Sequence, residues 1–254
     1  MKIALYQSDI VWGDPEANRT RLSEALRTAP EADLYVLPEM FTTGFATSPE
    51  GIAEEAPCRT LDFLKELSAG YDAAFAGSVA LHEDGRYFNR FYFVKPDGSV
   101  AQYDKHHLFT FSGEDRTYTA GKNTVVVEWR GVRFILLICY DLRFPVFSRN
   151  LGDYDAIIYV ASWPAVRRYA WDTLVRARAI ENQCYVAAVN RTGNDPACSY
   201  NGGTALIDPY GKVVASCPDG IEGFATAEID MDALEQFREK FPVLSDADDF
   251  TIHY

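Results

Sequence analysis

The chain has 254 residues, of which 48% are hydrophobic and 24% are charged, and this composition excludes a disordered, collagen-like or coiled-coil protein. Its 24 Lys and Arg residues against 37 Asp and Glu residues give a formal net charge of −13. That charge argues against a nucleic-acid or anionic-membrane partner, because both require a positive surface. No apolar run is long enough to span a membrane. We therefore expect a single domain over residues 1–254.

The first half of the chain alternates short apolar strands with helices and then forms a meander. The first helix has Asp14 as its predicted N-cap and Pro15 at its first position. Two turn sequences, 83–85 and 96–98, separate the strands of the meander. The predicted strands are 2–10, 33–37, 73–81, 87–94 and 100–104, and the second predicted helix is 58–67.

The second half contains both crossover connections and tight hairpins. This combination predicts mixed sheets rather than a doubly wound parallel sheet alone. Asp230 is the predicted N-cap of the last helix, and an acidic tail, 245–254, follows it. The predicted strands are 124–129, 132–138, 155–160, 185–190, 203–207, 212–215 and 224–229, and the predicted helices are 169–182 and 231–240.

The cysteine pattern and the N-terminus both indicate a reducing compartment. The chain has five cysteines, an odd number, and no C-x-x-C pair. It starts with an apolar, strand-like segment rather than with a signal-peptide pattern. We therefore expect a cytoplasmic protein with free thiols. Four of these thiols are interpreted as packing or loop residues without a partnered base: Cys58, Cys184, Cys198 and Cys217.

Cys139 is the candidate nucleophile. It ends the apolar strand 132–138, and the polar segment after it predicts a turn into a helix near Pro145. A cysteine at the carboxyl end of a strand can lie on an exposed turn, where backbone N–H groups and cations lower the thiol pKa and favour the thiolate. The other interpretation is a packing residue, since free cysteines are commonly buried.

A cysteine hydrolase also needs a general base and a group that stabilises an oxyanion. The four histidines serve poorly as bases, because His106 and His107 would face opposite sides of a strand and the other two lie at a turn and in the tail. No metal-binding motif occurs in the sequence. We therefore expect a carboxylate base and no metal ion.

Two further polar residues follow apolar runs, as Cys139 does. Glu39 comes just beyond the strand 33–37, and Lys105 lies at the end of the meander. Loops at strand ends commonly build sites in α/β proteins. Alone, each residue is more often a solvated carboxylate or a surface lysine, so their joint occurrence with Cys139 is what indicates a site.

Three motifs in this order resemble those of the nitrilase, or carbon–nitrogen hydrolase, superfamily, which uses a Glu-Lys-Cys triad. Segment 37–41 resembles its glutamate motif, 103–109 its lysine motif and 138–145 its cysteine motif. Segments 176–186 and 201–211 are similar to later family segments. The resemblance covers essentially the whole chain.

The resemblance implies an α/β fold of the αββα sandwich type, with mixed sheets flanked by helices. It implies Cys139 as nucleophile, Glu39 as general base and acid, and Lys105 as oxyanion stabiliser, helped by the N–H group of Tyr140. Glu114 matches a second family glutamate that would position Lys105 or the substrate, although a solvated loop carboxylate is the alternative. The implied reaction passes through a thioester and uses no cofactor. Family members usually form homodimers or larger homo-oligomers.

Within the superfamily, the chain most resembles bacterial ω-amidases of the 2-oxoglutaramate amidase type. This implies hydrolysis of a small ω-amide of a 2-oxo dicarboxylic acid, such as 2-oxoglutaramate or 2-oxosuccinamate. Arg143 then becomes a candidate reader of the substrate carboxylate, although a structural salt bridge with Asp141 or a neighbour is the alternative. Trp163 is a candidate wall of the substrate pocket, with core packing as the alternative.

Two other functions remain open at the level of sequence. The first is another amidohydrolase of the same superfamily: an N-carbamoyl amino acid amidase, an aliphatic amidase or a nitrilase. The second is a catalytically silent interaction protein on the same fold. The presence of Glu39, Lys105 and Cys139 together argues against the second, because a binding module has no need of all three.

Overall fold

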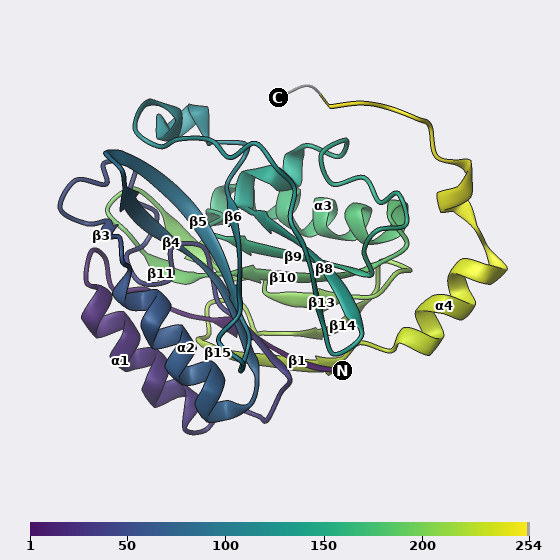
Figure 1. Cartoon of the computed structure of the whole chain (residues 1–254), viewed down its shortest axis with the longest axis horizontal. Coiled ribbons are helices and arrows are strands. Elements are labelled where there is room, and N and C mark those ends of the chain that lie inside the picture. Colours follow the sequence, from purple (N-terminus) through teal and green to yellow (C-terminus); the bar gives the residue numbers. More distant parts are fainter. Residues whose placement is uncertain (253–254) are drawn as a thin grey trace.

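Two β-sheets pack face to face in the computed structural model, which describes residues 1–252 (Figure 1). The last two residues of the predicted domain and tail, 253–254, lie outside the described residues. The first sheet has the strand order β15-β1-β2-β4-β5-β6, with β3 beside β4. Its strands are β1 (Lys2–Gln7), β2 (Leu34–Val36), β3 (Glu54–Glu55), β4 (Ala74–Glu83), β5 (Arg86–Val94), β6 (Val100–Asp104) and β15 (Gly223–Glu228).

The second sheet has the order β14-β13-β10-β9-β8-β7. Its three central strands, β8, β9 and β10, are parallel, and its outer pairs are antiparallel. The first sheet is mixed in the same way, with parallel β1-β2-β4 and the antiparallel meander β4-β5-β6. The strands of the second sheet are β7 (Val126–Trp129), β8 (Val132–Ile138), β9 (Ala156–Ala161), β10 (Tyr185–Asn190), β13 (Ala205–Ile207) and β14 (Val213–Ser216).

Helices cover the outer face of each sheet, which gives the expected αββα order (Figure 1). α1 (Pro15–Leu26) and α2 (Arg59–Tyr71) lie on the first sheet, and α3 (Arg168–Glu181) lies on the second. The Asp14 carboxylate caps α1 by accepting from the N–H of Ala17 at 3.0 Å. Asp230 caps α4 (Met231–Lys240) in the same way. No helix of the described residues is long and apolar enough to cross a membrane.

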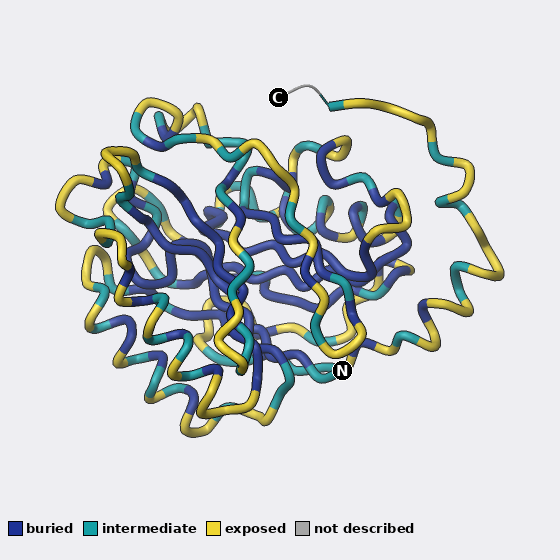
Figure 2. The backbone as a smooth tube through the Cα atoms, in the orientation of Figure 1, coloured by how far each residue is buried: buried dark blue, intermediate teal, exposed yellow. Residues whose placement is uncertain are grey.

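The alternation of side chains along β1 shows how the layers are joined. Ile3 and Leu5 belong to the cluster that contains Phe134 and the other buried residues of the second sheet. The residues between and after them, such as Tyr6, pack under α1 instead. Because successive side chains of a strand face opposite ways, both faces are apolar, and the buried core runs through both sheets (Figure 2).

The structure differs from the sequence-based elements at short, irregular segments. β3 and the hairpin formed by β11 (Thr192–Asn194) and β12 (Ser199–Asn201) were not predicted, because strands of two or three residues carry no readable alternation. The strand predicted to begin at Gly203 begins at Ala205, since Gly203 has a φ of 96°. Beyond Cys139 the chain forms a 3₁₀ turn, η3 (Cys139–Arg143), instead of an α-helix.

Candidate active site

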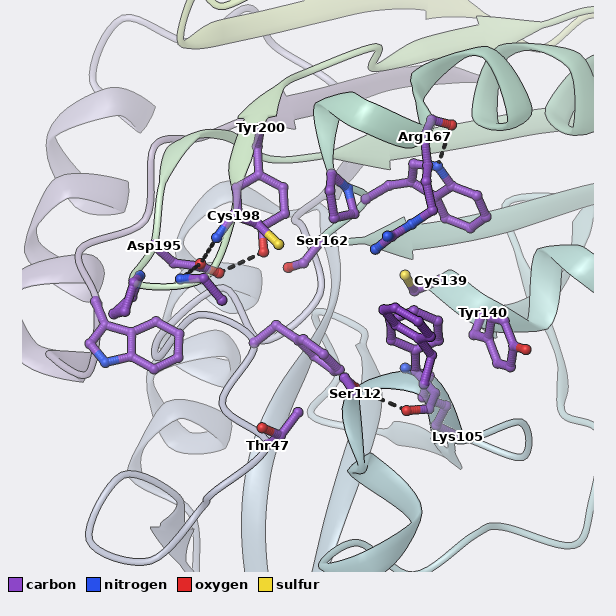
Figure 3. A pocket seen from close by; sticks show the side chains of 18 of the residues that line it. Thr47, Lys105, Ser112, Cys139, Tyr140, Ser162, Arg167, Asp195, Cys198 and Tyr200 are labelled. Atoms are coloured by element: carbon purple, nitrogen blue, oxygen red, sulfur yellow. Dashed lines mark hydrogen bonds between the residues drawn. The ribbon is translucent and has the colours of Figure 1, made fainter.

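Strand ends from both sheets meet around a cavity of about 570 Å³ (Figure 3). Glu39 follows β2, Lys105 follows β6 and Cys139 follows β8. Lys105 and Cys139 line the cavity, and Glu39 lies fully buried against Lys105. The fold therefore brings together the three residues of the predicted triad.

Glu39 lies in the turn after β2, where hydrogen bonds join it to both sheets. The turn is fixed to β4 by the N–H of Met40, which donates to Ser78 Oγ at 2.9 Å. Across the sandwich, the N–H of Ser162 donates to Glu39 Oε2 at 2.8 Å, and Ser162 Oγ donates to the Glu39 carbonyl at 3.3 Å. Both the carboxylate and the main-chain carbonyl of Glu39 are thus anchored, which fixes the carboxylate in one orientation.

The Lys105 ammonium lies between two carboxylates. Its Nζ is 2.8 Å from Glu39 Oε1 and 2.9 Å from Glu114 Oε2, and all three side chains are 0% exposed. Glu114 also accepts the N–H of Phe109 at 2.5 Å, which ties the loop 109–114 to the site. The alternative of a solvated loop carboxylate for Glu114 is therefore wrong.

Asn89 completes this buried network, and sequence reasoning did not identify it. Its Nδ2 donates to Glu39 Oε1 at 2.8 Å and to Glu114 Oε1 at 3.3 Å. Asn89 lies in the middle of β5 and is fully buried. The available signal was an amide side chain among the aromatic residues and two arginines of β5, since a buried amide needs partners.

The electrostatics of the cluster keep Lys105 charged and Cys139 protonated at rest. Burial would lower the pKa of Lys105, but the charges of Glu114 and Glu39 outweigh it and raise that pKa above its ordinary value. Burial raises the pKa of Glu114 more than Lys105 lowers it. Burial, followed by the charge of Glu39, raises the pKa of the Cys139 thiol well above its ordinary value. The sequence-based expectation of a lowered thiol pKa is therefore wrong, because burial and the adjacent Glu39 carboxylate together outweigh the lysine.

Cys139 opens the turn η3 with a φ of 45°, a left-handed conformation that is uncommon for a residue with a side chain. Such strain concentrates at functional sites. Tyr140 is the second residue of η3, so its N–H has no acceptor within the turn, and Tyr140 also lines the cavity. A backbone donor and the Lys105 ammonium are thus both available beside the thiol.

Asp141 joins the cysteine turn to the lysine segment. Its carboxylate is fully buried; Oδ2 accepts from Tyr103 Oη at 2.8 Å and from the N–H of Ile138 at 2.9 Å. Oδ1 accepts from the N–H and Nδ1 of His107, at 3.0 Å and 2.8 Å. Tyr103 and His107 flank Lys105 in the chain, so Asp141 sets where Lys105 lies relative to Cys139.

The family model for carbon-nitrogen hydrolases matches residues 2–239. The chain belongs to the carbon-nitrogen hydrolase family. The match extends from β1 into α4 and includes every residue of the cluster around Lys105.

Relatives of this hydrolase match it over nearly their whole length. It is 44% identical to omega-amidase YafV of Escherichia coli strain K12, over 99% of this chain and 98% of that protein. It is 35% identical to the 2-oxoglutaramate amidase of Bacillus subtilis, over 96% of each chain. The hydrolase is thus an amidohydrolase that acts on carbon–nitrogen bonds.

Solved structures agree with the fold. XC1258 of Xanthomonas campestris, a CN-hydrolase superfamily protein with an arsenic adduct in its active site, superposes with a TM-score of 0.96 at 40% identity and covers 100% of this chain and 99% of its own. Nit3 of Saccharomyces cerevisiae, from branch 10 of the nitrilase superfamily, superposes with a TM-score of 0.83 at 26% identity. That match covers 96% of this chain and 94% of Nit3. The αββα fold of the hydrolase is therefore confirmed.

Of the predicted substrate-binding residues, Arg143 and Trp163 both line the cavity, as Tyr140 does. Arg143 Cζ lies 4.8 Å from the centroid of the Trp163 ring. Trp163 is buried and also contacts Trp171 of the core, so this residue both lines the cavity and packs in the core. The predicted alternative, a salt bridge of Arg143 with Asp141 or a neighbour, is wrong. Arg143 forms no ion pair within residues 1–252, and the Asp141 carboxylate instead accepts from Tyr103, Ile138 and His107.

Arg167 and Cys198 are among the cavity residues of the hydrolase that come from segments without a family motif. Arg167 ends the 3₁₀ turn η4 (Ala165–Arg167) and reaches the cavity from the entry to α3. Cys198 lies in the β11–β12 hairpin and also lines the cavity, unlike the buried packing thiols of Cys58, Cys184 and Cys217. Within residues 1–252, no cluster of His, Cys, Asp and Glu is arranged to hold a metal ion.

Proposed function

We propose that this amidohydrolase cleaves the ω-amide of a small 2-oxo dicarboxylic acid, of the 2-oxoglutaramate or 2-oxosuccinamate type, to the dicarboxylate and ammonia. The observation that carries the proposal is the Arg143 guanidinium, which lines the same cavity as Cys139 and forms no ion pair within residues 1–252. A planar guanidinium suits a carboxylate. The names of the relatives, omega-amidase and 2-oxoglutaramate amidase, support the same substrate class.

In the first half of the reaction, Glu39 takes the proton of the Cys139 thiol, and the thiolate attacks the amide carbon. The thiol lies against the Glu39 carboxylate, so this proton moves between neighbouring groups. Lys105 and the N–H of Tyr140 hold the oxyanion that develops on the former carbonyl oxygen. Glu39 then gives its proton to the amide nitrogen, the C–N bond breaks with release of ammonia, and an acyl thioester remains on Cys139.

In the second half, Glu39 acts as base again. It takes a proton from a water molecule, which attacks the thioester carbon. The tetrahedral intermediate then collapses with release of the Cys139 thiolate, which takes the proton back from Glu39. Glu39 and Lys105 thus return to their starting charges. Because Lys105 stays charged, with its pKa raised by Glu114 and Glu39, it can stabilise the oxyanion in both halves.

The substrate class is tested by ammonia release from a panel of compounds: 2-oxoglutaramate, glutamine, an N-carbamoyl amino acid and an aliphatic nitrile. We expect kcat/KM for 2-oxoglutaramate to exceed that for glutamine by about 100-fold, because the ammonium of glutamine would place a like charge near Arg143.

A higher kcat/KM for the N-carbamoyl compound or the nitrile would instead assign the enzyme to another activity of the family. Equal rates with glutamine and 2-oxoglutaramate would show that the 2-oxo group is not recognised. Replacing Arg143 by Lys keeps the charge but loses the planar fork, so it should raise KM for acidic amides and leave a neutral amide unaffected.

A further inference from the structure

Two guanidinium groups, not one, line the cavity that holds Cys139. Arg143 closes the turn η3, whereas Arg167 arrives from η4, far along the chain. Arg167 is half-buried, and its side chain extends into the cavity toward Cys139 (Figure 3). The two arginines therefore approach the same space from different elements.

Each guanidinium lies over an aromatic face. Arg143 Cζ is 4.8 Å from the ring centroid of Trp163, and Arg167 Cζ is 5.3 Å from that of Phe109. Stacking on a ring holds a guanidinium in place and leaves its N–H groups free to bind an anion. The rings thus orient both groups without neutralising them.

Trp163 couples the two arginines. Its ring lies beneath Arg143, and its Nε1 donates to the carbonyl oxygen of Arg167 at 2.9 Å. The indole is buried, with 3% of the residue exposed, so it has little freedom to move. One fixed side chain therefore sets the positions of both arginines.

No carboxylate of the described residues neutralises these two groups. Neither Arg143 nor Arg167 takes part in an ion pair within residues 1–252, whereas the next residue, Arg168, pairs with Asp172 at 2.8 Å and Asp219 at 3.0 Å.

The acidic residues near the cavity are engaged elsewhere. Asp195, which lines the cavity, accepts from Tyr200 Oη at 2.6 Å and from the N–H groups of Ala197 and Cys198. Glu39 and Glu114 are bound to Lys105. The cavity of a protein with a net charge of −13 thus carries two uncompensated positive charges, and an anion within it would be strongly favoured.

We propose that Arg167 determines substrate specificity together with Arg143, and that the two guanidiniums bind the carboxylate of the amide substrate at the end opposite the scissile bond. A carboxylate has two oxygens that can each accept more than one hydrogen bond, so it can bridge two guanidiniums. This inference rests on the proposed function and deepens it, because it places the recognition of the acid on a residue outside the family motifs.

The test compares Arg167→Met with the wild type on three substrates. Two are amides of equal chain length, the acidic glutaramate (the monoamide of glutarate) and the neutral pentanamide, and the third is 2-oxoglutaramate. Methionine keeps an apolar stem for contact with Phe109 but removes the charge. We expect KM for both acidic amides to rise about 10- to 100-fold, with kcat changed little and kcat/KM for pentanamide unchanged. Arg27→Met, at an exposed position at the end of α1, is the matched control for the loss of one positive charge.

The double variant Arg143→Met/Arg167→Met gives an independent check. Because both groups bind the same carboxylate, its effect on KM should be smaller than the product of the two single effects. Arg167→Lys should recover part of the loss, since it restores the charge without the fork. If Arg167→Met is poorly folded by circular dichroism, Arg167→Gln takes its place.

The outcomes separate this inference from the proposed function. Equal losses on the acidic and neutral amides, or no loss on either, would overturn the assignment of Arg167. If the wild type prefers glutaramate to pentanamide but does not hydrolyse 2-oxoglutaramate, the proposed substrate is wrong while the two-arginine site stands. If the wild type hydrolyses 2-oxoglutaramate and Arg167→Met has the same KM for the acidic amides, the two-arginine site is wrong while the proposed substrate stands.

Discussion

Glu39 is the residue on which both halves of the proposed reaction depend. Its carboxylate binds Lys105 and lies near enough to the Cys139 thiol to raise the pKa of that thiol. Lys105 has a second carboxylate partner, Glu114, which keeps the ammonium in place while Glu39 changes its protonation state. In the proposed reaction, Glu39 moves the protons and Glu114 holds Lys105, which accounts for the presence of two carboxylates in the site.

Replacing Glu39 by Gln should separate thiol ionisation from catalysis. The substitution removes the charge and the hydrogen bond that raise the pKa of Cys139 and leaves the lowering effect of Lys105. We therefore expect the thiol pKa to fall below that of the wild type, while amide hydrolysis falls by about 10²- to 10⁴-fold because no group moves the protons.

The thiol pKa is measured from the pH dependence of alkylation by iodoacetamide, followed by mass spectrometry of the peptide that contains Cys139. The same substitution at the exposed Glu50 is the control. A Glu39→Gln variant whose thiol pKa rises, or whose amide hydrolysis is intact, would contradict the role of Glu39.

At the scale of elements, the site depends on how the turn after β8 is joined to the segment after β6. The two segments belong to different sheets, and the fully buried Asp141 carboxylate connects them. It accepts four hydrogen bonds, of which three come from Tyr103 and His107, on either side of Lys105. Asp141 therefore acts as a positioning residue for Lys105 and Cys139.

Replacing Asp141 by Asn should weaken both the fold and catalysis. The amide oxygen can replace one carboxylate oxygen, but the amide NH₂ cannot accept from the donors of the other, so two buried donors lose their partner. We expect the free energy of unfolding to fall by about 2–4 kcal/mol. We also expect kcat to fall by about 10- to 100-fold with little change in KM.

Stability is measured by urea unfolding and kcat by ammonia release at a temperature where the variant is folded. Asp115→Asn, an exposed change in the same region, is the control and should alter neither. A destabilised Asp141→Asn enzyme with wild-type kcat would reduce Asp141 to a purely structural residue.

At the scale of the whole molecule, sequence predicted what is local and missed what is long-range. The caps Asp14 and Asp230 and the longer strands were readable because their signals lie within a few residues. Glu39, Lys105 and Cys139 were found because each follows an apolar run and matches a family motif. The local signal of Asn89 is a single amide in β5, and Arg167 carries none. Only the fold of the first sheet and the entry to α3 bring these two residues to the site.

The charge distribution also belongs to the whole molecule. A net charge of −13 predicts repulsion of an anionic substrate at long range, but salt screens this beyond about 8 Å under physiological conditions. Near the cavity, the uncompensated Arg143 and Arg167 set the local field. In the proposed account, these two side chains rather than the overall charge select the substrate.

The central claim, that Cys139 carries out the hydrolysis of an ω-amide, is tested most directly by ammonia release from 2-oxoglutaramate with the wild type, Cys139→Ala and Cys198→Ala. Cys198 lines the same cavity and is the matched control. We predict turnover by the wild type and by Cys198→Ala, and a rate for Cys139→Ala equal to that without enzyme. Turnover by Cys139→Ala above that background would contradict the account.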